Sequence, residues 1–367
     1  MFSHQQKVNN VKQVYMPVTS YEVLRKNFDD ALNSYNNSNN NNENGGSKKL
    51  FFFQNAINHL CRICRILKFP SGGNILLVGI GGKKTLSRLA SFMCNFKVHE
   101  IKNQNDYNMN EFHKDLKNLF IKTGIDNQEY VLLIHESEIA DEELFVPLNE
   151  FLAFGSIKNI FDDDENKMII NRIRNKLNSN GERNEKDHVI WKYFIEKVQS
   201  SLKVILCFSP LGKKFKLMIR KFPSLIYRMK IDWFHDWPES ALISVASLFI
   251  DDIDVIDANI KIKIAEFVAV SHKNVNIIAD DYKNSENVIY YITPNTFLKY
   301  LANIKDLIDK KSREINENID KYTTGIKKIK DIEEEVKKLK LTLNNQDIEI
   351  AKRTVEVDKI LKVKFKM

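Results

Sequence analysis

The chain is poor in the residues that interrupt regular structure or build disulfide frameworks. Of its 367 residues only 12 are glycine, 7 are proline and 4 are cysteine. Few glycines and prolines indicate a chain made mostly of helices and strands. Few cysteines fit a reducing compartment. Cys61 and Cys64 form one C-x-x-C pair, but no second pair exists to complete a zinc site, which favours two small core residues one helical turn apart.

Long apolar runs are also missing. No run approaches the ~20 residues that span a bilayer, and the N-terminal stretch MFSHQQKVNN lacks the apolar segment of a signal peptide. We therefore expect a soluble, intracellular protein with no membrane partner. Hydrophobic residues make up 43% of the chain and charged residues 28%, enough for a sizeable core. The net charge of +8 suits an acidic partner, but it is spread along the chain and identifies none.

Apolar runs alternate with helical stretches between residues 50 and 237. The runs GNILLVGI, EYVLLIHESE, SLKVILCFSP and SLIYRMKIDWF predict buried parallel strands. This alternation predicts an α/β domain with a parallel sheet and helices on both faces. A helix capped by Thr19 or Ser20 precedes it, followed by the Asn-rich stretch 36–46, which we expect to be a disordered insertion. Residues 238–292 have helical patterns only and predict a small helical domain.

The C-terminal segment predicts one strand of a coiled coil. Thr293 is a typical N-cap and Pro294 a typical first helical residue. Apolar residues then recur every seven positions: Leu301, Ile308, Ile315, Tyr322, Ile329, Val336, Leu343, Ile350 and Val357. The second seam is weaker, because Ile319, Ile326 and Leu361 are apolar whereas Glu333, Lys340 and Asp347 are not. A helix of roughly 100 Å with one apolar seam needs a partner helix, from another copy or from elsewhere.

The stretch NILLVGIGGKKTLSRLASF has the order strand, glycine turn, helix that builds a phosphate-binding loop. The consensus is G-x-x-x-x-G-K-[ST]. Here Gly79, Gly81 and Gly82 would supply backbone N–H groups, Lys83 or Lys84 would reach the phosphates, and Thr85 would bind Mg²⁺. The loop is at least one residue short and lacks the glycine before its lysine. ATP or ADP with Mg²⁺ is therefore the expected cofactor, with ancestry better supported than binding.

Three further residues occupy positions where such ATPases carry catalytic groups. Glu136 ends the second strand, where an acid could orient water, although His135 replaces the usual metal-holding aspartate. Ser209 ends the third strand, the place of a residue that senses the γ-phosphate. Arg220 lies where an arginine would act on the neighbouring subunit's nucleotide. A solvated strand-end acid and a basic helix face are the plain structural alternatives for Glu136 and Arg220.

Several stretches resemble one known family. GNILLVGIGG…LSRLASF, VILCFSPLGKKFKLMIRKFPSLI and IDWFHDWPESAL resemble the fourth AAA+ module of dynein heavy chains. FFFQNAINHLCRICRIL resembles the helix before its phosphate loop, and YYITPNTFLKYL resembles the start of the outgoing stalk helix. The resemblance covers roughly residues 20–360 in the same order, and it is closer to axonemal than to cytoplasmic heavy chains.

The resemblance implies a fold and a set of partners. It divides the chain into an N-terminal helix with the insertion (1–49), an AAA+ α/β domain (50–237), a small helical AAA+ subdomain (238–292) and the first strand of the stalk coiled coil (293–367). It implies part of an ATP-dependent, minus-end-directed microtubule motor, in which the fourth module is regulatory. Partners would be the other AAA+ modules, the returning stalk helix, microtubules through the stalk tip, and dynein intermediate and light chains. The location would be the cytoskeleton, and the axoneme of a cilium or flagellum in particular.

The chain also departs from the family's pattern. The family loop reads roughly G-V-G-G-S-G-K-Q-S, so this chain lacks the Ser-Gly pair, with Lys83 in the lysine position and Thr85 in that of the serine. Glu136 falls on the family's nucleotide motif, and Arg220 falls where the module would complete the preceding module's site. A loop shortened by two residues should misplace several N–H donors, so we predict weak or no ATP binding and little or no hydrolysis here.

Two other classes of function remain open. One is a self-standing P-loop ATPase that acts on nucleic acid and dimerises through its coiled coil, which the basic charge permits but which lacks an intact loop and a signature motif. The other is a non-catalytic AAA+ scaffold that dimerises through residues 294–362. Salt-dependent DNA binding would favour the first. Concentration-dependent helix content without ATP binding would favour the second.

Overall fold

The computed structural model describes residues 2–4, 15–17, 20–40, 52–70, 72–79, 81–101, 108–139, 142–179, 186–210, 213–251, 253, 256–286, 288 and 290–364. The chain forms two compact units. The first comprises residues 1–248 and 258–299, and the second comprises residues 249–257 and 300–367. Among the described residues, no helix is long and apolar enough to cross a bilayer.

The first unit is built on a five-stranded sheet in the order β4-β5-β6-β3-β7. Every neighbouring pair in it is parallel. The strands are β3 (Ile75–Gly79), β4 (Lys97–Glu100), β5 (Tyr130–His135), β6 (Leu202–Phe208) and β7 (Lys230–Phe234). The four predicted strands are confirmed, with β3 between β6 and β7. The carboxyl ends of all five strands meet at one edge, where parallel α/β sheets bind ligands.

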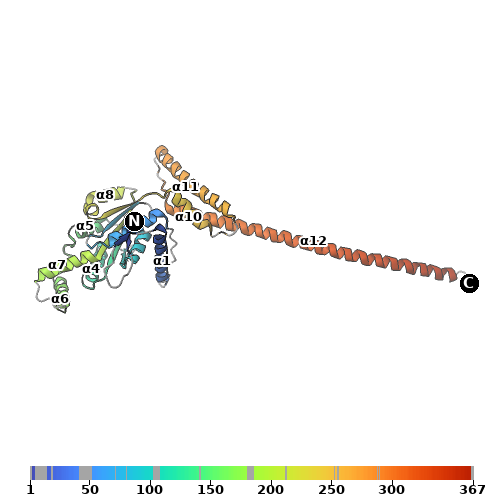
Figure 1. Ribbon diagram of the computed structural model, residues 1–367, viewed down its shortest axis with the longest axis horizontal. Coiled ribbons are helices and arrows are strands. Elements are labelled where there is room, and N and C mark those ends of the chain that lie inside the picture. The colour runs from blue at the N-terminus through green and yellow to red at the C-terminus, as the bar shows by residue number, and fades with distance from the viewer. Residues whose placement is uncertain are drawn as a thin grey trace. The chain divides into compact units, whose positions relative to one another are not determined.

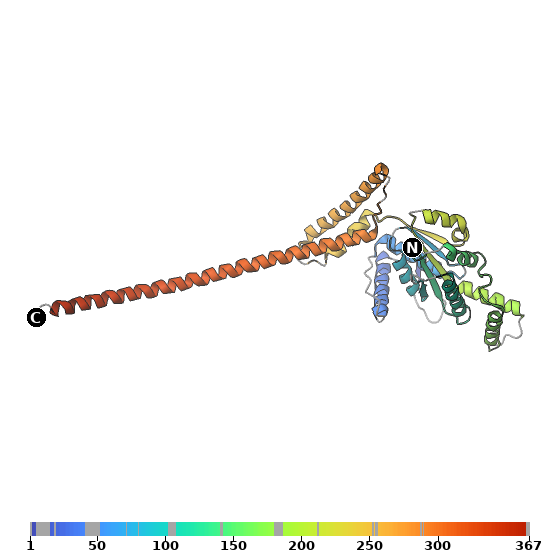
Figure 2. The ribbon, with the colours of Figure 1, turned by 180° about the vertical axis from the view of Figure 1, so that it is seen from behind.

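Helices cover both faces of this sheet (Figures 1 and 2). Successive strand residues face opposite layers, so Leu76 and Val78 join one core while Ile75 and Leu77 join the other. The first core is closed by α4 (Met109–Gly124), α5 (Phe145–Phe154), α6 (Asp163–Ser179) and α7 (Asp187–Ser201). The second is closed by α1 (Tyr21–Asn40), α2 (Gln54–Leu67) and α3 (Lys83–Met93). The predicted fold class, a parallel sheet with helices on both faces, is confirmed.

The remaining elements are short or follow the sheet. Next to the sheet lie the 3-10 turns η1 (Glu136–Glu138) and η2 (Glu142–Leu144) and the helices α8 (Lys213–Lys221) and α9 (Ser224–Tyr227). After β7 come α10 (Glu239–Asp251), α11 (Ala258–Glu286) and α12 (Pro294–Lys364). The described part of the chain contains no strand beyond Phe234, as the sequence predicted.

Three features differ from the sequence analysis. Strand β4 was missed, because KVHE is short, polar and at the edge of the sheet. An antiparallel pair of short strands, β1 (Phe2–His4) and β2 (Tyr15–Pro17), was also missed. Helix α1 continues through Asn40, five residues into the stretch expected to be disordered, and residues 41–46 of that stretch lie outside the described residues. Ser20 caps this helix, since its hydroxyl accepts the N–H of Glu22 at 3.2 Å.

The start of α12 is anchored in the first unit. The Thr293 N–H donates to the Thr296 hydroxyl at 3.0 Å, and the Thr296 N–H donates back to the Thr293 hydroxyl at 3.2 Å. This reciprocal pair is a capping box directly before the predicted first residue, Pro294. One turn later Phe297 is fully buried between the rings of His272 on α11 and Trp237.

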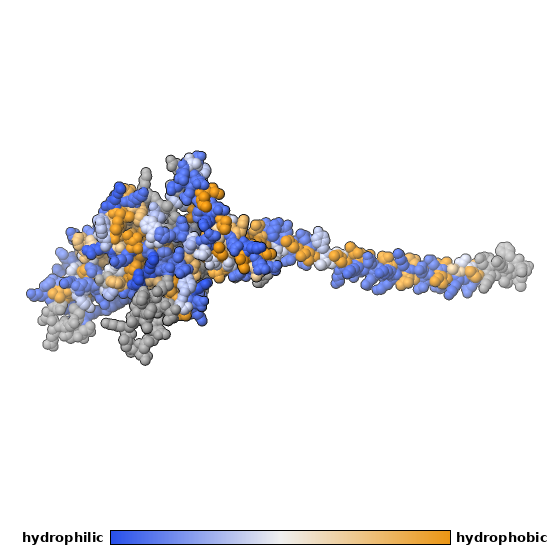
Figure 3. All heavy atoms as spheres, turned by 45° about the horizontal axis from the view of Figure 1, so that its top comes forward, coloured by the Kyte–Doolittle hydropathy of each residue, from blue (hydrophilic) through white to orange (hydrophobic). Residues whose placement is uncertain are grey.

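The second unit contains the rest of α12, which is one continuous helix of 71 residues in total. Its apolar seam is exposed: Ile315, Tyr322, Ile329 and Leu343 each keep more than half of their side-chain surface accessible. Figure 3 shows apolar and hydrophilic patches following one another along this helix. Exposed apolar residues at this spacing need a partner helix.

The second seam of α12 changes its position part-way along the helix. Before residue 329 its members follow the main seam by four residues, as in Ile319 and Ile326. After that point they follow by three, as in Ile332 and Leu339, and all four are exposed. This three-residue shift of phase explains why Glu333 and Lys340 interrupt the seam that the sequence analysis extrapolated. Such a shift overwinds a coiled coil locally.

Candidate functional site

The short glycine loop lies where the predicted phosphate site should be. Strand β3 ends at Gly79, and Gly81 and Gly82 both adopt positive φ angles, of 80° and 75°, before α3 begins at Lys83. Glycine adopts this left-handed backbone at little cost, because it has no Cβ. Gly82 is the N-cap residue of α3, so the predicted order of strand, glycine turn and helix is confirmed. Ile80 lies outside the described residues.

Lys83 does not extend into open space. Its side chain is 5% exposed, and its ammonium donates to the backbone carbonyl of Gly79, at the start of the same loop. Burial lowers the pKa of Lys83, and the nearby Glu136 charge opposes that shift. The lysine predicted to reach a phosphate is therefore satisfied by the loop itself.

Lys84 is held by carboxylates. Its ammonium pairs with Glu138 on η1 and, at 3.2 Å, with Glu100 at the end of β4. Arg88, one turn further along α3, also pairs with Glu100. Burial alone would lower the pKa of Lys84, but the hydrogen bond to Glu138 and the two carboxylate charges raise it. We call this cluster of Lys84, Arg88, Glu100 and Glu138 the carboxylate network.

Glu136 and Ser209, both predicted from the sequence, meet at the carboxyl edge of the sheet. The Glu136 carboxylate accepts the backbone N–H of Ser209 at 2.7 Å, which ties the end of β5 to the end of β6. His135 caps η1: its Nδ1 accepts the Ser137 N–H at 3.2 Å. Burial, followed by the Lys83 charge, lowers the pKa of His135. His135 is therefore a neutral capping residue in the place of a metal-holding aspartate.

The other candidates lie apart from this cluster. Arg220 is exposed on α8, which fits either of its two interpretations, and its predicted action on a neighbouring module stays a prediction. The four cysteines are free thiols in or beside the core, as the structural interpretation of Cys61 and Cys64 predicted. Among the described residues, no group of three or more histidine, cysteine, aspartate or glutamate side chains could hold a metal ion.

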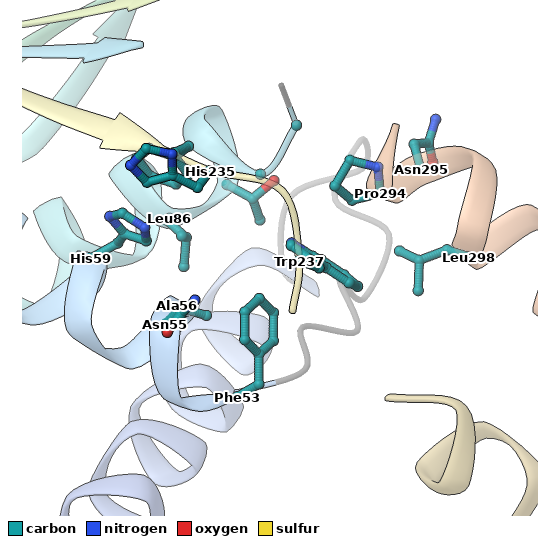
Figure 4. A pocket seen from close by; sticks show the side chains of 14 residues that line it. Phe53, Asn55, Ala56, His59, Leu86, His235, Trp237, Pro294, Asn295 and Leu298 are labelled. Carbon is teal, nitrogen blue, oxygen red and sulfur yellow. The ribbon is translucent and has the colours of Figure 1, made fainter. Parts of the chain in front are cut away.

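A cavity of about 470 Å³ opens beside the glycine loop. Residues from four segments line it: the start of α2, the loop with α3, the segment after β7, and the first turn of α12 (Figure 4). Phe53 and Trp237 pack against each other in its wall, with ring centroids 4.8 Å apart and the planes 59° from parallel. Pro294 closes one side, because a Cβ on Gly81 would lie 3.2 Å from its ring. The sequence analysis named Gly81, Gly82 and Thr85 here but missed the aromatic wall, whose members are far apart in the chain.

The site fits the two ends of a nucleotide unequally. Both lysines that could neutralise phosphates are engaged, Lys83 by Gly79 and Lys84 by the carboxylate network. The acids nearest the loop, Glu136 and Glu138, are engaged by the Ser209 N–H and by Lys84. A triphosphate with Mg²⁺ does not fit these residues as they are arranged. The cavity beside them is large enough for a base and ribose.

Residues 49–307 match the model of one protein family, described as the P-loop containing dynein motor region D4. The chain belongs to this dynein family. The match covers the sheet, the helices around it except α1, and also α10, α11 and the first turns of α12. The resemblance to the fourth module of dynein heavy chains is thereby confirmed.

Relatives across most of the chain are axonemal dyneins. The chain is 35% identical over 351 residues to the ciliary dynein beta chain of Heliocidaris crassispina and 37% identical over 351 residues to dynein axonemal heavy chain 17 of Homo sapiens. It is 32% identical over 350 residues to the flagellar outer arm dynein beta chain of Chlamydomonas reinhardtii. Each alignment covers 95% of this chain and 8% of the relative. The chain therefore corresponds to a small part of the dynein heavy-chain motor region.

Proposed function

We propose that this chain is the regulatory fourth AAA+ module of an axonemal-type dynein heavy chain, together with the outgoing strand of its stalk. Its domains are the segments 1–49, 50–237, 238–292 and 293–367. The module transmits changes of shape between the motor ring and the microtubule-binding stalk, and it does so with little or no hydrolysis of ATP. The ciliary and flagellar names of its relatives support an axonemal location.

One observation carries the non-hydrolytic part of this proposal. Lys83, the lysine of the loop, is buried against the carbonyl of Gly79 and lies outside the cavity lining. The loop lacks two residues of the family pattern. As a result no space remains between Lys83 and the end of β3. A triphosphate would have to displace this contact and also the two carboxylates on Lys84. Weak binding, and turnover that is weaker still, follow from the cost of leaving those charges unpaired.

The purified chain tests this directly. ATP turnover and ATP·Mg affinity are measured for the wild type and for Lys83→Ala, and we expect no difference in turnover between them. A second variant restores the missing pair by inserting serine and glycine between Gly82 and Lys83, and it should bind ATP more tightly than the wild type. Wild-type hydrolysis that Lys83→Ala abolishes would contradict the proposal.

The partners proposed for the module follow from its two ends. The exposed apolar seam of α12 supports a returning stalk helix as its partner, with microtubules bound at the stalk tip. Arg220, exposed on α8, is proposed to act on the nucleotide of the preceding AAA+ module. Intermediate and light chains are proposed for the whole heavy chain, of which this chain corresponds to 8% of the relatives' length.

The exposure of the seam also favours a second candidate, a scaffold that pairs with another copy of itself through residues 294–362. Sedimentation of the full chain distinguishes the two. A monomer at all concentrations fits a helix whose partner is another segment of a heavy chain. A dimer whose helix content rises with concentration fits the scaffold.

A further inference from the structure

Three of the four cysteines lie where α2 packs against α3. Cys61 and Cys64 are one turn apart on α2, and Cys94 is the C-cap residue of α3. Cys94 belongs to the core cluster on this face of the sheet, and Cys61 and Cys64 pack against the same cluster. All three are free thiols. The C-x-x-C pair of the sequence therefore has a third cysteine beside it that comes from a different helix.

Cys64 and Cys94 reach across the contact between the two helices in opposite directions. The Cys94 thiol donates to the backbone carbonyl of Cys64, with the sulfur 3.7 Å from the oxygen. The Cys64 thiol donates to the carbonyl of Ala90, one turn before Cys94 on α3, with the sulfur 4.0 Å from the oxygen. Each sulfur thus lies beside the backbone that carries the other. A disulfide requires this placement, because its two Cα atoms lie only about 5.5–6 Å apart.

The surroundings of the pair favour a thiolate at Cys94. A hydrogen bond from the Cys64 thiol lowers the pKa of Cys94, burial opposes this shift, and the charge of Lys68 at the end of α2 adds to it. The same hydrogen bond, together with burial, raises the pKa of Cys64. The thiolate is the form of cysteine that reacts with peroxides. One sulfur is thus prepared as a nucleophile, and its neighbour remains a thiol.

The other two cysteines are less suited to oxidation. Cys207 on β6 is fully buried, and burial raises its pKa to about 12. Burial also raises the pKa of Cys61. Cys64 is partly exposed and Cys94 keeps 6% of its surface accessible, so solvent reaches the pair. An oxidant that reaches Cys94 must be small, and it should distinguish this cysteine from Cys61 and Cys207.

We propose that Cys64 and Cys94 form a site of reversible oxidation, at which hydrogen peroxide closes a disulfide between α2 and α3. The Cys94 thiolate attacks one oxygen of the peroxide, the O–O bond breaks, and the hydroxide that leaves takes a proton from solvent. The Cys64 sulfur then attacks the sulfenic acid on Cys94 and loses its proton, and the sulfenic oxygen leaves as a second water. Two thiols lose two electrons in total, and one peroxide gains them. A small dithiol reverses the step by exchange.

The bridge would restrain the part of the chain that contains the glycine loop. It would close a loop of about 30 residues, from Cys64 to Cys94, that includes β3, the glycine loop and α3. The end of α2 and the end of α3 could then no longer move apart. In a module proposed to transmit changes of shape, oxidation would hold one shape. The chemistry itself requires neither nucleotide nor a partner chain, so it stands or fails apart from the proposed function.

Trypsin places the four cysteines on four different peptides, so the bridge can be identified directly. Cys64 lies in peptide 63–65, Cys94 in 89–97, Cys61 in 50–62 and Cys207 in 204–213. The folded full chain is treated with a slight excess of hydrogen peroxide, its remaining thiols are alkylated, and the digest is analysed by mass spectrometry. We expect peptide 63–65 joined to 89–97, with Cys61 and Cys207 alkylated, and no joined peptide after treatment with dithiothreitol.

The same digest of the wild type can overturn the proposal without any variant. A bridge between peptides 50–62 and 63–65 would show that the C-x-x-C pair closes on itself. Four alkylated thiols would show that the site does not react. Oxidation of Cys94 beyond the sulfenic acid with no bridge would show that Cys64 does not reach it. Each of these results contradicts the proposal.

Two serine variants assign the roles of the sulfurs. Cys64→Ser keeps a hydroxyl donor beside Cys94 but removes the second thiol, so Cys94 should stop at the sulfenic acid, which dimedone labels on peptide 89–97. Cys61→Ser is the matched control one turn away on α2, and it should form the bridge to the same extent as the wild type. Loss of the bridge in Cys61→Ser, or no dimedone label in Cys64→Ser, would overturn these roles.

Thermal unfolding measures the restraint. A closed loop of about 30 residues should raise the Tm of the oxidised chain by about 5 °C or more, and dithiothreitol should reverse the shift. Cys64→Ser treated with the same peroxide should show no such rise, which controls for oxidation elsewhere. An unchanged or lower Tm in the bridged wild type would mean that the disulfide strains the contact between α2 and α3, contrary to the proposal.

Discussion

The Glu136 carboxylate accepts the backbone N–H of Ser209 at 2.7 Å and so joins the ends of two neighbouring strands. In a working phosphate site both positions would face the nucleotide. Here the Glu136 carboxylate and the Ser209 N–H bind each other instead. The same relationship recurs at Lys83 and Gly79 and at Lys84 and Glu138, so groups placed for catalysis serve as internal contacts.

Substitution of Glu136 should therefore affect stability and leave turnover unchanged. Glu136→Ala removes the acceptor of a partly buried N–H and should cost about 1–2 kcal/mol of unfolding free energy. Glu136→Gln keeps an acceptor oxygen and should cost less than half of that. Urea unfolding measures both, with ATP turnover measured in parallel. A loss of turnover in Glu136→Gln without loss of stability would show Glu136 to be catalytic instead.

Release of Lys84 from the carboxylate network should restore part of the phosphate affinity. Glu138→Gln removes one of its two partner charges, and we expect ADP to bind several-fold more tightly, by about 1 kcal/mol. Adenosine, which has no phosphate, should bind as before. Glu142→Gln is the matched control, because Glu142 pairs with Lys221 outside the loop. Equal effects of both variants on ADP would point to general electrostatics and not to Lys84.

Lys203 should give the protein a rising stability in mild alkali. This residue of β6 is 1% exposed, and its ammonium donates to the carbonyl of Phe69 at 2.9 Å. Burial lowers its pKa from 10.5 to about 8. Between those values the unfolded chain binds more protons than the folded one, so stability rises with pH. Relative to Lys203→Met, the wild type should gain on the order of 2–3 kcal/mol between pH 8 and pH 10.5.

Urea unfolding at several pH values tests this expectation, because the difference between wild type and Lys203→Met cancels the titration of the other lysines. A difference that stays constant with pH would mean that Lys203 is charged in the folded protein throughout. A difference that falls with pH would mean that the pKa of Lys203 is raised in the folded protein, which contradicts the expectation.

Two glycines should respond in opposite ways to alanine. Gly325 lies inside α12 with nothing near the position of an added Cβ, so Gly325→Ala should stabilise the helix by about 1 kcal/mol. Gly155 caps α5 with φ +74°, and an added Cβ would collide with Gln199, so Gly155→Ala should destabilise by more than about 1 kcal/mol. Thermal unfolding followed by circular dichroism measures both. Destabilisation by Gly325→Ala would mean that this position is not regular helix.

The sheet and its layers could be predicted because buried strands appear in the sequence as apolar runs. Three of the five sheet strands, β3, β5 and β6, are mostly apolar segments, and β5 and β6 pair in parallel over Tyr130–His135 and Leu202–Cys207. The edge strand β4 could not be predicted, since its residues Lys97, His99 and Glu100 are polar and only pairing with β5 makes them a strand. Sequence patterns record burial better than they record pairing.

The site was predictable in its backbone and not in its contacts. Spacing alone placed Gly81, Gly82 and Lys83 at the turn between strand and helix. It did not reveal that Lys83 turns back onto the loop, because no local pattern encodes where a flexible side chain ends. The aromatic wall was missed for another reason. Phe53 precedes all five strands of the sheet and Trp237 follows them, so the two residues meet only in the folded chain.

The carboxylate network has a consequence for how such a protein is made. Here Lys84 and Arg88 are already balanced by Glu100 and Glu138 within the chain. This segment therefore needs no bound anion to balance its two cations when it folds. A self-sufficient folding unit of this kind would give the growing chain a stable structure early, independent of the cell's supply of nucleotide.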